Sequence, residues 1–309
     1  MVNQTPIVTK QKRRLPIKAI MLTIAVLVFV SIPSIAAVVG WSLTHPEREL
    51  IEVRPESFDL TYEEIEFHSE RDNILLKGWL IPTENKKKIV IFAHGYADNR
   101  SNIEAALPTA KALYDKGIPS LLFDFQNSGE SEGTVTSVGH FEKADLLAAV
   151  NFLKTEGYEE VIFIGYSMGA VVSLITAPDV SEVKAVVADS PFSDLRSYLE
   201  DNLPVWSGLP AFPFTPLIMA EMPLLTGIDM DQVRPIEAVQ NLGERPLLLI
   251  HTKDDNKIPS TNSEEIYKVS NSPHTELWMT PGTEHIGSYN ENPEEYLNKI
   301  ILFVEKSFQ

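Results

Sequence analysis

Hydrophobic positions follow two different patterns along this chain, before and after about residue 58. Residues 17–43 form an apolar run with one charge, Lys18, near its start. That run is longer than the ~20 apolar residues that a helix needs to cross a bilayer. After residue 58, short apolar segments alternate with longer segments in which apolar residues recur at helical spacing. The pattern predicts one apolar N-terminal helix followed by an α/β domain.

The first two strands of that domain are expected at 58–68 and 74–81, joined by a polar turn as a hairpin. Short apolar runs predict the later strands, at 89–93, 118–123, 161–164, 183–188, 246–250 and 275–279. Amphipathic segments predict helices at 102–116, 139–155, 168–177, 260–269 and 293–306. Apolar strands separated by helices are typical of a doubly wound, mostly parallel sheet with its ligand site at the carboxyl ends of the strands.

The alternation stops between Pro191 and Arg245, in a segment rich in proline and aromatic residues. A structureless loop of that length is improbable in a compact domain. We therefore expect a small lid of short helices at about residues 192–243, inserted before the penultimate strand. The remaining boundaries are expected to be a basic tail at 1–16, the apolar segment at 17–43, a connector at 44–57 and the α/β domain at 58–309.

The apolar N-terminal segment has two interpretations. Basic residues cluster at 10–18, and the positive-inside rule would keep them cytoplasmic and put the α/β domain outside. The sequence Ser34-Ile35-Ala36 resembles a signal-cleavage site, so secretion after cleavage is the alternative. The apolar run continues past that site to Trp41, which favours a retained single-pass anchor. Because this segment has no place in the sheet, a chain lacking residues 1–44 is expected to be a soluble, active domain, monomeric or oligomeric.

Composition and charge exclude several classes of function. The chain has no cysteine, which rules out disulfides, thiolate zinc sites and a cysteine nucleophile. The seven histidines show no HExxH-type spacing, so no metal site is expected. No cofactor is expected either. Residues 1–46 hold five basic and no acidic side chains, whereas residues 47–309 hold 21 basic and 43 acidic ones, a formal −22. Such a domain repels nucleic acids and highly anionic substrates.

The clearest candidate for chemistry is Gly165-Tyr166-Ser167-Met168-Gly169, directly after an apolar strand. Glycines at both ends let a strand turn sharply into a helix, and such a turn lifts the serine off the sheet near the positive end of the helix. The same pattern also occurs by chance as a turn with a helix-capping serine, so its context has to decide.

Two kinds of group would have to accompany a serine nucleophile, the first being donors for an oxyanion. The sequence His94-Gly95-Tyr96 follows a strand, and its glycine would let the Tyr96 N–H turn toward the serine. Together with the Met168 N–H it would form an oxyanion hole. Without Ser167, the His-Gly pair would indicate only a glycine in a loop.

The second kind is a histidine oriented by an acid. His285 lies in a turn-rich loop after the last expected strand. Asp254 and Asp255 follow the strand that ends at Ile250, and Asp189 ends the strand before it. The chain order serine, acid, histidine is the order that α/β-hydrolases use, each residue following a strand.

These motifs, in this order, resemble those of the serine α/β-hydrolases over about residues 58–308, and are most similar to an esterase-like and acyltransferase-like bacterial branch with a lid. Residues 124–133 resemble the family's Asp-x-Arg-Gly-x-Gly-x-Ser-x-Gly turn, with Gln126-Asn127 in place of Arg-Gly. The segment Asp189-Ser190-Pro191-Phe192 resembles the family's exit toward the lid. Thr252 replaces the usual Gly after the strand-end histidine His251.

The family's His-Gly-x-x-Asp-x-x-Val-Pro segment, aligned on His251, implies Asp255 as the acid. The resemblance implies a carboxylic-ester hydrolase in which His285 takes the proton of Ser167 and water later releases the acyl group. A peptidase or amidase, or an acyltransferase, using the same triad is the alternative, followed by a non-catalytic surface-binding protein. The expected substrate is a small-molecule acyl ester, with His94 and Phe192 as candidate pocket residues.

Overall fold

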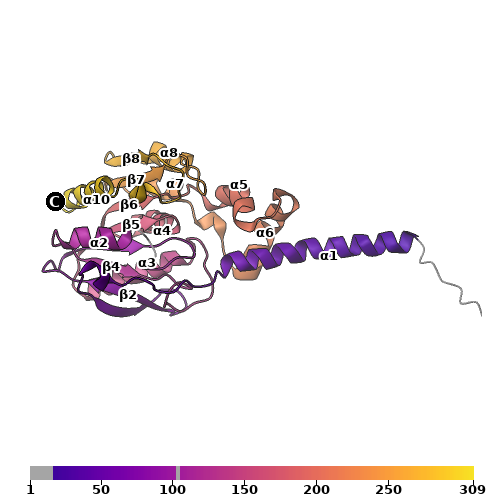
Figure 1. Ribbon diagram of the computed structural model, residues 1–309, viewed down its shortest axis with the longest axis horizontal. Helices are drawn as coiled ribbons and strands as arrows, with labels where there is room; N and C mark the ends of the chain where they lie inside the picture. Colours follow the sequence, from indigo (N-terminus) through magenta and orange to yellow (C-terminus); the bar gives the residue numbers. More distant parts are fainter. Residues whose placement is uncertain (1–16, 102–104) are drawn as a thin grey trace, which may run out of the picture.

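The apolar runs of the sequence form one twisted sheet with helices on both faces, and a long N-terminal helix projects from one side (Figure 1). This computed structural model describes residues 17–101 and 105–309. The expected basic tail, 1–16, and residues 102–104 of the helix expected at 102–116 lie outside the described residues.

Within the described residues the sheet has eight strands, in the order β1-β2-β4-β3-β5-β6-β7-β8. The pairings β1–β2 and β2–β4 are antiparallel, and all pairings from β4 through β3 to β8 are parallel. The expected fold, a mostly parallel doubly wound sheet that begins with a hairpin, is confirmed. The strands are β1 (Glu63–His68), β2 (Leu75–Ile81), β3 (Lys88–Ala93), β4 (Ser120–Phe123), β5 (Glu160–Tyr166), β6 (Val183–Asp189), β7 (Leu247–Thr252) and β8 (Thr275–Thr280).

Side chains alternate between two apolar clusters, one on each face of the sheet. In β3, Ile89 and Ile91 join the cluster under α3, α4 and α8, whereas Val90 and Phe92 join the cluster under α2 and α10. Both faces are therefore dry, as continuous apolar strands require. The helices of this domain are α2 (Ala106–Tyr114), α3 (Glu142–Thr155), α4 (Met168–Thr176), α8 (Thr261–Val269), α9 (Ser288–Glu291) and α10 (Pro293–Ser307), with 3-10 turns at Pro55–Phe58 and Ala177–Asp179.

The lid lies between β6 and β7 and consists mainly of α5 (Leu195–Ser207) and α6 (Ala211–Thr226). Its helices are longer than the proline content of the sequence suggested. Phe212 is extended, with φ −103° and ψ 132°, so the regular part of α6 starts at Pro213. Pro213 and Pro216 then fall in the first turn, where a missing N–H costs little. Short turns complete the lid at Met230–Gln232, Pro235–Ala238 (α7) and Val239–Asn241.

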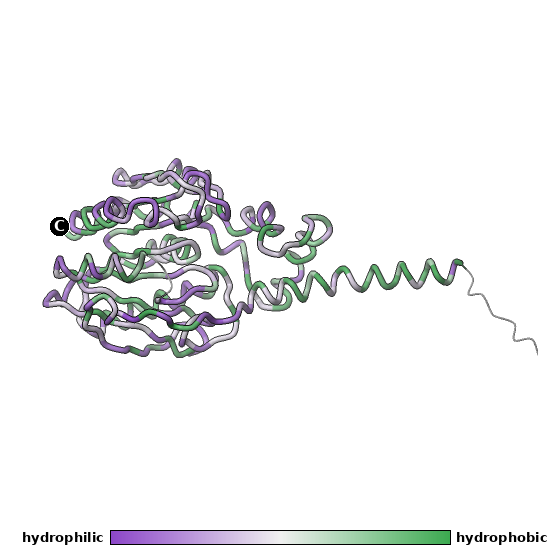
Figure 2. The backbone as a smooth tube through the Cα atoms, in the orientation of Figure 1, coloured by the Kyte–Doolittle hydropathy of each residue, from purple (hydrophilic) through white to green (hydrophobic). Residues whose placement is uncertain are grey.

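The apolar N-terminal segment forms α1 (Ile17–Thr44), a helix of 28 residues that ends against the lid (Figures 1 and 2). Ala36, Gly40 and Thr44 are buried there, and their spacing of four residues puts them on one face of α1. A Cβ on Gly40 would lie 2.4 Å from the sulfur of Met222 in α6. Small residues thus let α1 and α6 approach closely. The segment lies outside the sheet, but it packs on the lid, a contact that the sequence did not predict.

Candidate functional site

The turn between β5 and α4 holds Ser167 in a backbone conformation that side chains rarely adopt, with φ 50° and ψ −114°. The two flanking glycines make this turn possible. A Cβ on Gly165 would lie 2.3 Å from the carbonyl oxygen of Gly169, and a Cβ on Gly169 would lie 2.0 Å from that of Ala93. Any larger residue at either position would push α4 off the sheet, so the motif itself fixes Ser167 at the carboxyl ends of the strands.

A chain of two hydrogen bonds runs from Ser167 to a buried carboxylate. The Ser167 hydroxyl oxygen lies 2.8 Å from Nε2 of His285, and Nδ1 of His285 lies 2.7 Å from Oδ2 of Asp255. A carboxylate can only accept, so Nδ1–H donates to Asp255 and Nε2 is left to accept from the serine hydroxyl. The three residues come from the β5–α4 turn, the loop after β8 and the loop after β7, and only the fold brings them together.

The Asp255 carboxylate is held in place by its own loop. Its Oδ1 accepts the backbone N–H groups of Lys257, at 2.8 Å, and Ile258, at 2.9 Å. Burial acts to raise the pKa of Asp255, but hydrogen bonds from His251 and His285 outweigh it, and the pKa lies well below its ordinary value. Asp255 is therefore ionised at neutral pH and fixes both the tautomer and the orientation of His285.

The other two acids considered from the sequence have different surroundings. Asp254 is exposed to solvent. Asp189 is fully buried and accepts hydrogen bonds from the hydroxyls of Tyr296 and Ser190, both at 2.9 Å. Burial raises the pKa of Asp189 to about 6. Among the described residues, Asp255 is thus the acid whose carboxylate is hydrogen-bonded to His285.

An apolar cavity adjoins Ser167 beneath the lid. Tyr96 and Met168, whose amides the sequence suggested for an oxyanion hole, line it together with Ser167, and so does Phe192. Lining residues from other segments include Leu43 of α1, Leu203 and Trp206 of α5, Ile218, Met219 and Met222 of α6, and Met230. Such a cavity accepts an uncharged, apolar group next to the serine.

The contribution of α1 to this cavity is the part of the site that sequence reasoning missed. Gly40, Leu43 and Thr44 line the cavity from the end of α1. The Tyr96 hydroxyl also donates to the carbonyl oxygen of Leu43, at 2.6 Å, which ties the loop after β3 to α1. The sequence signal for this contact was the four-residue spacing of Ala36, Gly40 and Thr44, which puts small residues on one face of the helix. The surrounding residues are so apolar that the segment is equally typical of a simple membrane helix.

His94 has a different place from the one expected, since it is not among the cavity-lining residues in the described part of the chain. It is buried, its Nε2 accepts the N–H of Phe125 at 3.0 Å, and its Nδ1 donates to the carbonyl oxygen of Gly95 at 2.8 Å. Burial lowers the pKa of His94 to about 4. The neutral ring joins the loop after β3 to the loop after β4.

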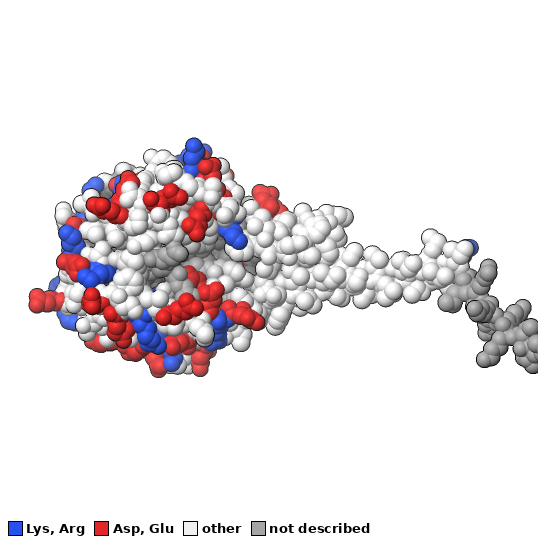
Figure 3. All heavy atoms as spheres, viewed as in Figure 1, with Lys and Arg blue, Asp and Glu red and all other residues white. Residues whose placement is uncertain are grey.

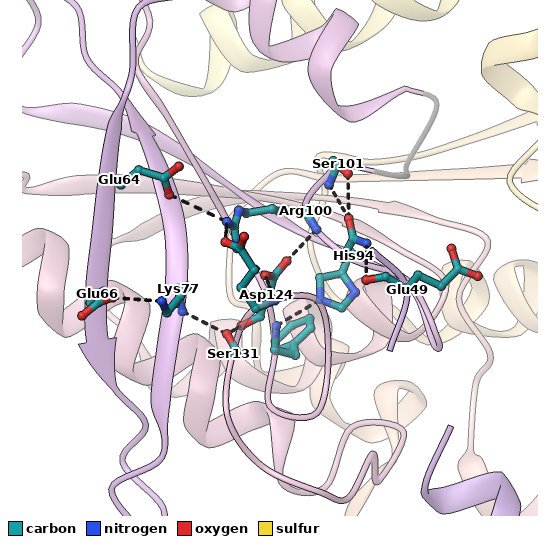
Figure 4. Close-up of polar contacts among 12 residues, drawn as sticks. Glu49, Glu64, Glu66, Lys77, His94, Arg100, Ser101, Asp124 and Ser131 are labelled. Carbon is teal, nitrogen blue, oxygen red and sulfur yellow. Dashed lines mark hydrogen bonds and ion pairs between the residues drawn. The ribbon is translucent and has the colours of Figure 1, made fainter. Parts of the chain in front are cut away.

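Arg100 organises a buried polar cluster next to His94 that the sequence did not indicate (Figure 4). Its guanidinium is fully buried, pairs with Asp124 and Glu130, and lies over the ring of Trp79 at 4.5 Å. The backbone N–H of Arg100 also donates to Oδ1 of Asp124, at 2.8 Å. This cluster holds the turn at residues 124–133. Its arginine, Arg100, lies before the turn in the chain, whereas the family pattern places an arginine within the turn.

One departure from the family turn has a direct backbone explanation. Asn127, which stands where the family has glycine, has φ 57°. Asparagine is one of the residues that tolerate this left-handed region. The replacement therefore keeps the turn.

No group of three or more His, Asp or Glu side chains within residues 17–101 and 105–309 is arranged to hold a metal ion.

Comparison with known proteins identifies the family. A family model described as the alpha/beta hydrolase fold matches residues 88–216. The uncharacterized protein YqkD of Bacillus subtilis is 30% identical over 234 residues, which cover 74% of this chain and 75% of that protein. The chain belongs to the α/β-hydrolase family. The uncharacterized protein YfhR of Escherichia coli K12 is similar to this α/β-hydrolase at 25% identity, over 78% of this chain and 80% of that protein.

Solved structures agree with this assignment. The esterase Pf2001 of Pyrococcus furiosus has a TM-score of 0.70 at 28% identity, covering 85% of this α/β-hydrolase and 98% of the esterase chain. Est1E of Butyrivibrio proteoclasticus, solved with ferulic acid bound, has a TM-score of 0.60 at 17% identity, over 80% of this chain and 99% of its own, which shows the shared fold alone. The family and its esterase neighbours support a hydrolase activity.

Proposed function

We propose that this α/β-hydrolase is a serine carboxylesterase in which Ser167 is the nucleophile, His285 the general base and Asp255 the acid that orients it. The observation that carries the proposal is the chain of hydrogen bonds from Asp255 through His285 to Ser167, at 2.7 and 2.8 Å, at the wall of an apolar cavity. Nucleophile and base are within hydrogen-bond reach, and the base is held by a third group.

The reaction follows from these positions. His285 takes the proton of the Ser167 hydroxyl as the serine oxygen attacks the ester carbonyl, and the developing imidazolium is stabilised by ionised Asp255. The amides of Tyr96 and Met168 hold the oxyanion, each such donor being worth on the order of 3 kcal/mol of transition-state stabilisation. The alcohol leaves with the proton held by His285. Water, activated by the same histidine, then releases the acid.

We also infer that α1 is retained as a single-pass membrane anchor. Among the described residues, α1 is the helix long and apolar enough to cross a membrane. Cleavage after Ala36 would remove a fully buried side chain from the contact with the lid, which supports retention over cleavage. The basic residues at 10–18 favour a cytoplasmic N-terminus and an extracytoplasmic catalytic domain.

A fluorophosphonate probe tests the nucleophile directly. It should label Ser167 of the full chain, and a peptide map should locate the label. A panel of matched esters and amides, with and without an alcohol acceptor, then separates an esterase from an amidase or an acyltransferase. A chain that is neither labelled nor active on any member of the panel would point to the non-catalytic alternative.

A further inference from the structure

We propose that the substrate is a membrane-lipid ester and that the end of α1 forms one wall of its acyl-chain site. The inference rests on the proposed function of Ser167 and deepens it by naming the substrate class and its route of entry. In this arrangement the anchor does more than attach the enzyme to the membrane. It completes the cavity next to the nucleophile.

The first argument is the composition of the cavity wall. Gly40 and Leu43 of α1 line the same space as Ile218 and Met222 of α6, and Ser167 lines it too. None of the cavity-lining residues in the described part of the chain carries a charge. A hydrocarbon chain fits such a lining, and its carbonyl would lie at Ser167. The polar part of the substrate must then lie outside the cavity.

The second argument is the apolar surface that the lid leaves uncovered. Phe212 and Leu224, near the two ends of α6, are 84% and 86% exposed. The 16 residues of α6 include a single ionisable side chain, Glu221. In the view of Figure 3, charged side chains cover the α/β domain but are sparse over the lid and α1. Large exposed apolar side chains of this kind mark a surface that contacts a membrane or a partner.

The third argument decides for the membrane. The lid and α1 lie on the same side of the α/β domain, opposite to α10 and the C-terminus (Figure 1). Most side chains along α1 are exposed, so α1 needs a bilayer around it. Because α6 packs on the last turns of α1, any bilayer that surrounds α1 brings the lid to its surface. The apolar side chains of the lid then enter the interface.

The charge of the α/β domain narrows the lipid class. Residues 47–309 carry a formal −22, which repels anionic headgroups. We therefore expect esters whose headgroup is uncharged or zwitterionic. The acyl group passes to the Ser167 oxygen as the lipid alcohol leaves with a proton from His285, and water then breaks the acyl-serine bond to give the free fatty acid and the original serine.

Chain-length selectivity tests the role of α1. The full chain in phosphatidylcholine vesicles is given monooleoylglycerol, which partitions into the bilayer, or triacetin, which is water-soluble. Gly40→Leu adds a side chain between Met222 and Ile218, where a Cβ already meets their atoms at 2.4 and 3.2 Å. We expect it to lower the ratio of kcat/KM for monooleoylglycerol to that for triacetin at least tenfold. Met222→Trp should act in the same direction from the lid side.

Val38→Leu is the matched control, because Val38 lies on the same helix but is 68% exposed and lies outside the cavity lining. It should leave the ratio unchanged. An unchanged ratio in Gly40→Leu and Met222→Trp, both still labelled by fluorophosphonate, overturns the inference. So does a parent enzyme that prefers triacetin. If Ser167 is not labelled and neither ester is cleaved, it is the proposed function that fails.

The membrane contact of the lid is tested separately, by accessibility. The chain has no cysteine, so a single introduced cysteine carries the only dye. F212C reports on the lid, and L302C is the matched control, since Leu302 is 66% exposed on α10 at the opposite side. In vesicles, iodide should quench the F212C dye several-fold less than the L302C dye. Equal quenching overturns the inference, as does shielding that follows protein concentration and not lipid, which would assign the lid surface to a second copy.

Discussion

Ser167 combines two properties that a nucleophile needs, access to a base and a fixed position. Its strained backbone, with φ 50°, is held by close packing of the flanking glycines and not by the serine side chain. The hydroxyl makes its hydrogen bond to His285. The side chain can therefore be changed at little cost to the fold.

Ser167→Ala should abolish ester turnover while shifting the free energy of unfolding by no more than about 0.5 kcal/mol, because one oxygen is lost and no cavity of consequence forms. His285→Ala should reduce kcat to a similar extent. Since the two residues act as a unit, the double variant should be hardly slower than either single one. Initial rates with triacetin and a thermal melt check both statements. Residual Ser167→Ala activity within tenfold of the parent would contradict the nucleophile assignment.

Asp255→Asn should lower kcat/KM by up to about 10⁴-fold, the loss known for the equivalent change in a serine protease triad, because an amide cannot hold the required tautomer of His285. Asp254→Asn is the matched control, being one residue away and exposed. Asp189→Asn should also retain most activity, since Asp189 bonds Tyr296 and Ser190. A collapse of activity in Asp189→Asn with an active Asp255→Asn would reverse the assignment.

The buried Asp189 carboxyl should make stability depend on pH. Its pKa rises from 3.8 in the unfolded chain to about 6 in the fold, so the folded state favours the protonated form. Its contribution to stability is then fully present below about pH 3.8 and is lost as the pH rises through about 6. Asp189→Asn removes this loss, which amounts to on the order of 3 kcal/mol. Relative to the parent, the variant should gain stability between pH 4 and pH 7 in thermal melts, and a constant difference would contradict this interpretation.

At the scale of elements, α1 and the lid depend on each other. The apolar residues Ile218 and Met222 of α6 are covered by the last turns of α1, around Ala36 and Gly40. The sheet and its two apolar clusters make no comparable use of α1. Losing α1 should therefore damage the lid and the cavity while leaving the sheet folded.

A chain starting at residue 45 should expose the buried face of α6, aggregate without detergent and lose most activity on long-chain esters. A chain starting at residue 35 retains Ala36, Gly40 and Thr44 and is the matched control, which should keep more of that activity. Size-exclusion chromatography and the ester panel compare the two. A soluble chain from residue 45 with the selectivity of the full protein would show that α1 is dispensable for the site.

At the scale of the whole molecule, charge is distributed unevenly. The five basic residues before position 47 all lie within 10–18, and residues 47–309 carry a formal −22. In the view of Figure 3, charged side chains cover the α/β domain and are sparse along the apolar α1. Basic residues stay on the cytoplasmic side of a membrane helix, whereas acidic domains cross with little hindrance. The proposed orientation thus rests on charge and not on the fold.

A reporter fused after Gln309 should read as extracytoplasmic, and mass spectrometry of the native protein should find an N-terminus before residue 17. Removing the positive charges at 10–18 is the control, since it should weaken or mix the orientation. A cytoplasmic reporter would reverse the orientation. A chain beginning at Ala37 would establish cleavage and reject the anchor.

The local elements and their order follow from residues that are close together in the chain. Continuous apolar runs such as that of β3 can only be buried on both faces, and Gly165 with Gly169 dictates a sharp turn because no Cβ fits at either position. These outcomes depend on residues within a few positions of each other. The alternation of strands and helices and the place of the lid could therefore be predicted from the amino-acid sequence alone.

Which distant groups meet is decided by the tertiary fold. His285 reaches a serine 118 residues away in the chain, and Tyr96 bonds Leu43 across 53 residues. The neutral, structural role of His94 and the burial of Arg100 depend on neighbours from other strands. Periodicity carries no information about such contacts, because it reports which face of an element is apolar and not which surface covers that face. The packing of α1 on the lid, and hence its place beside Ser167, could come only from the folded chain.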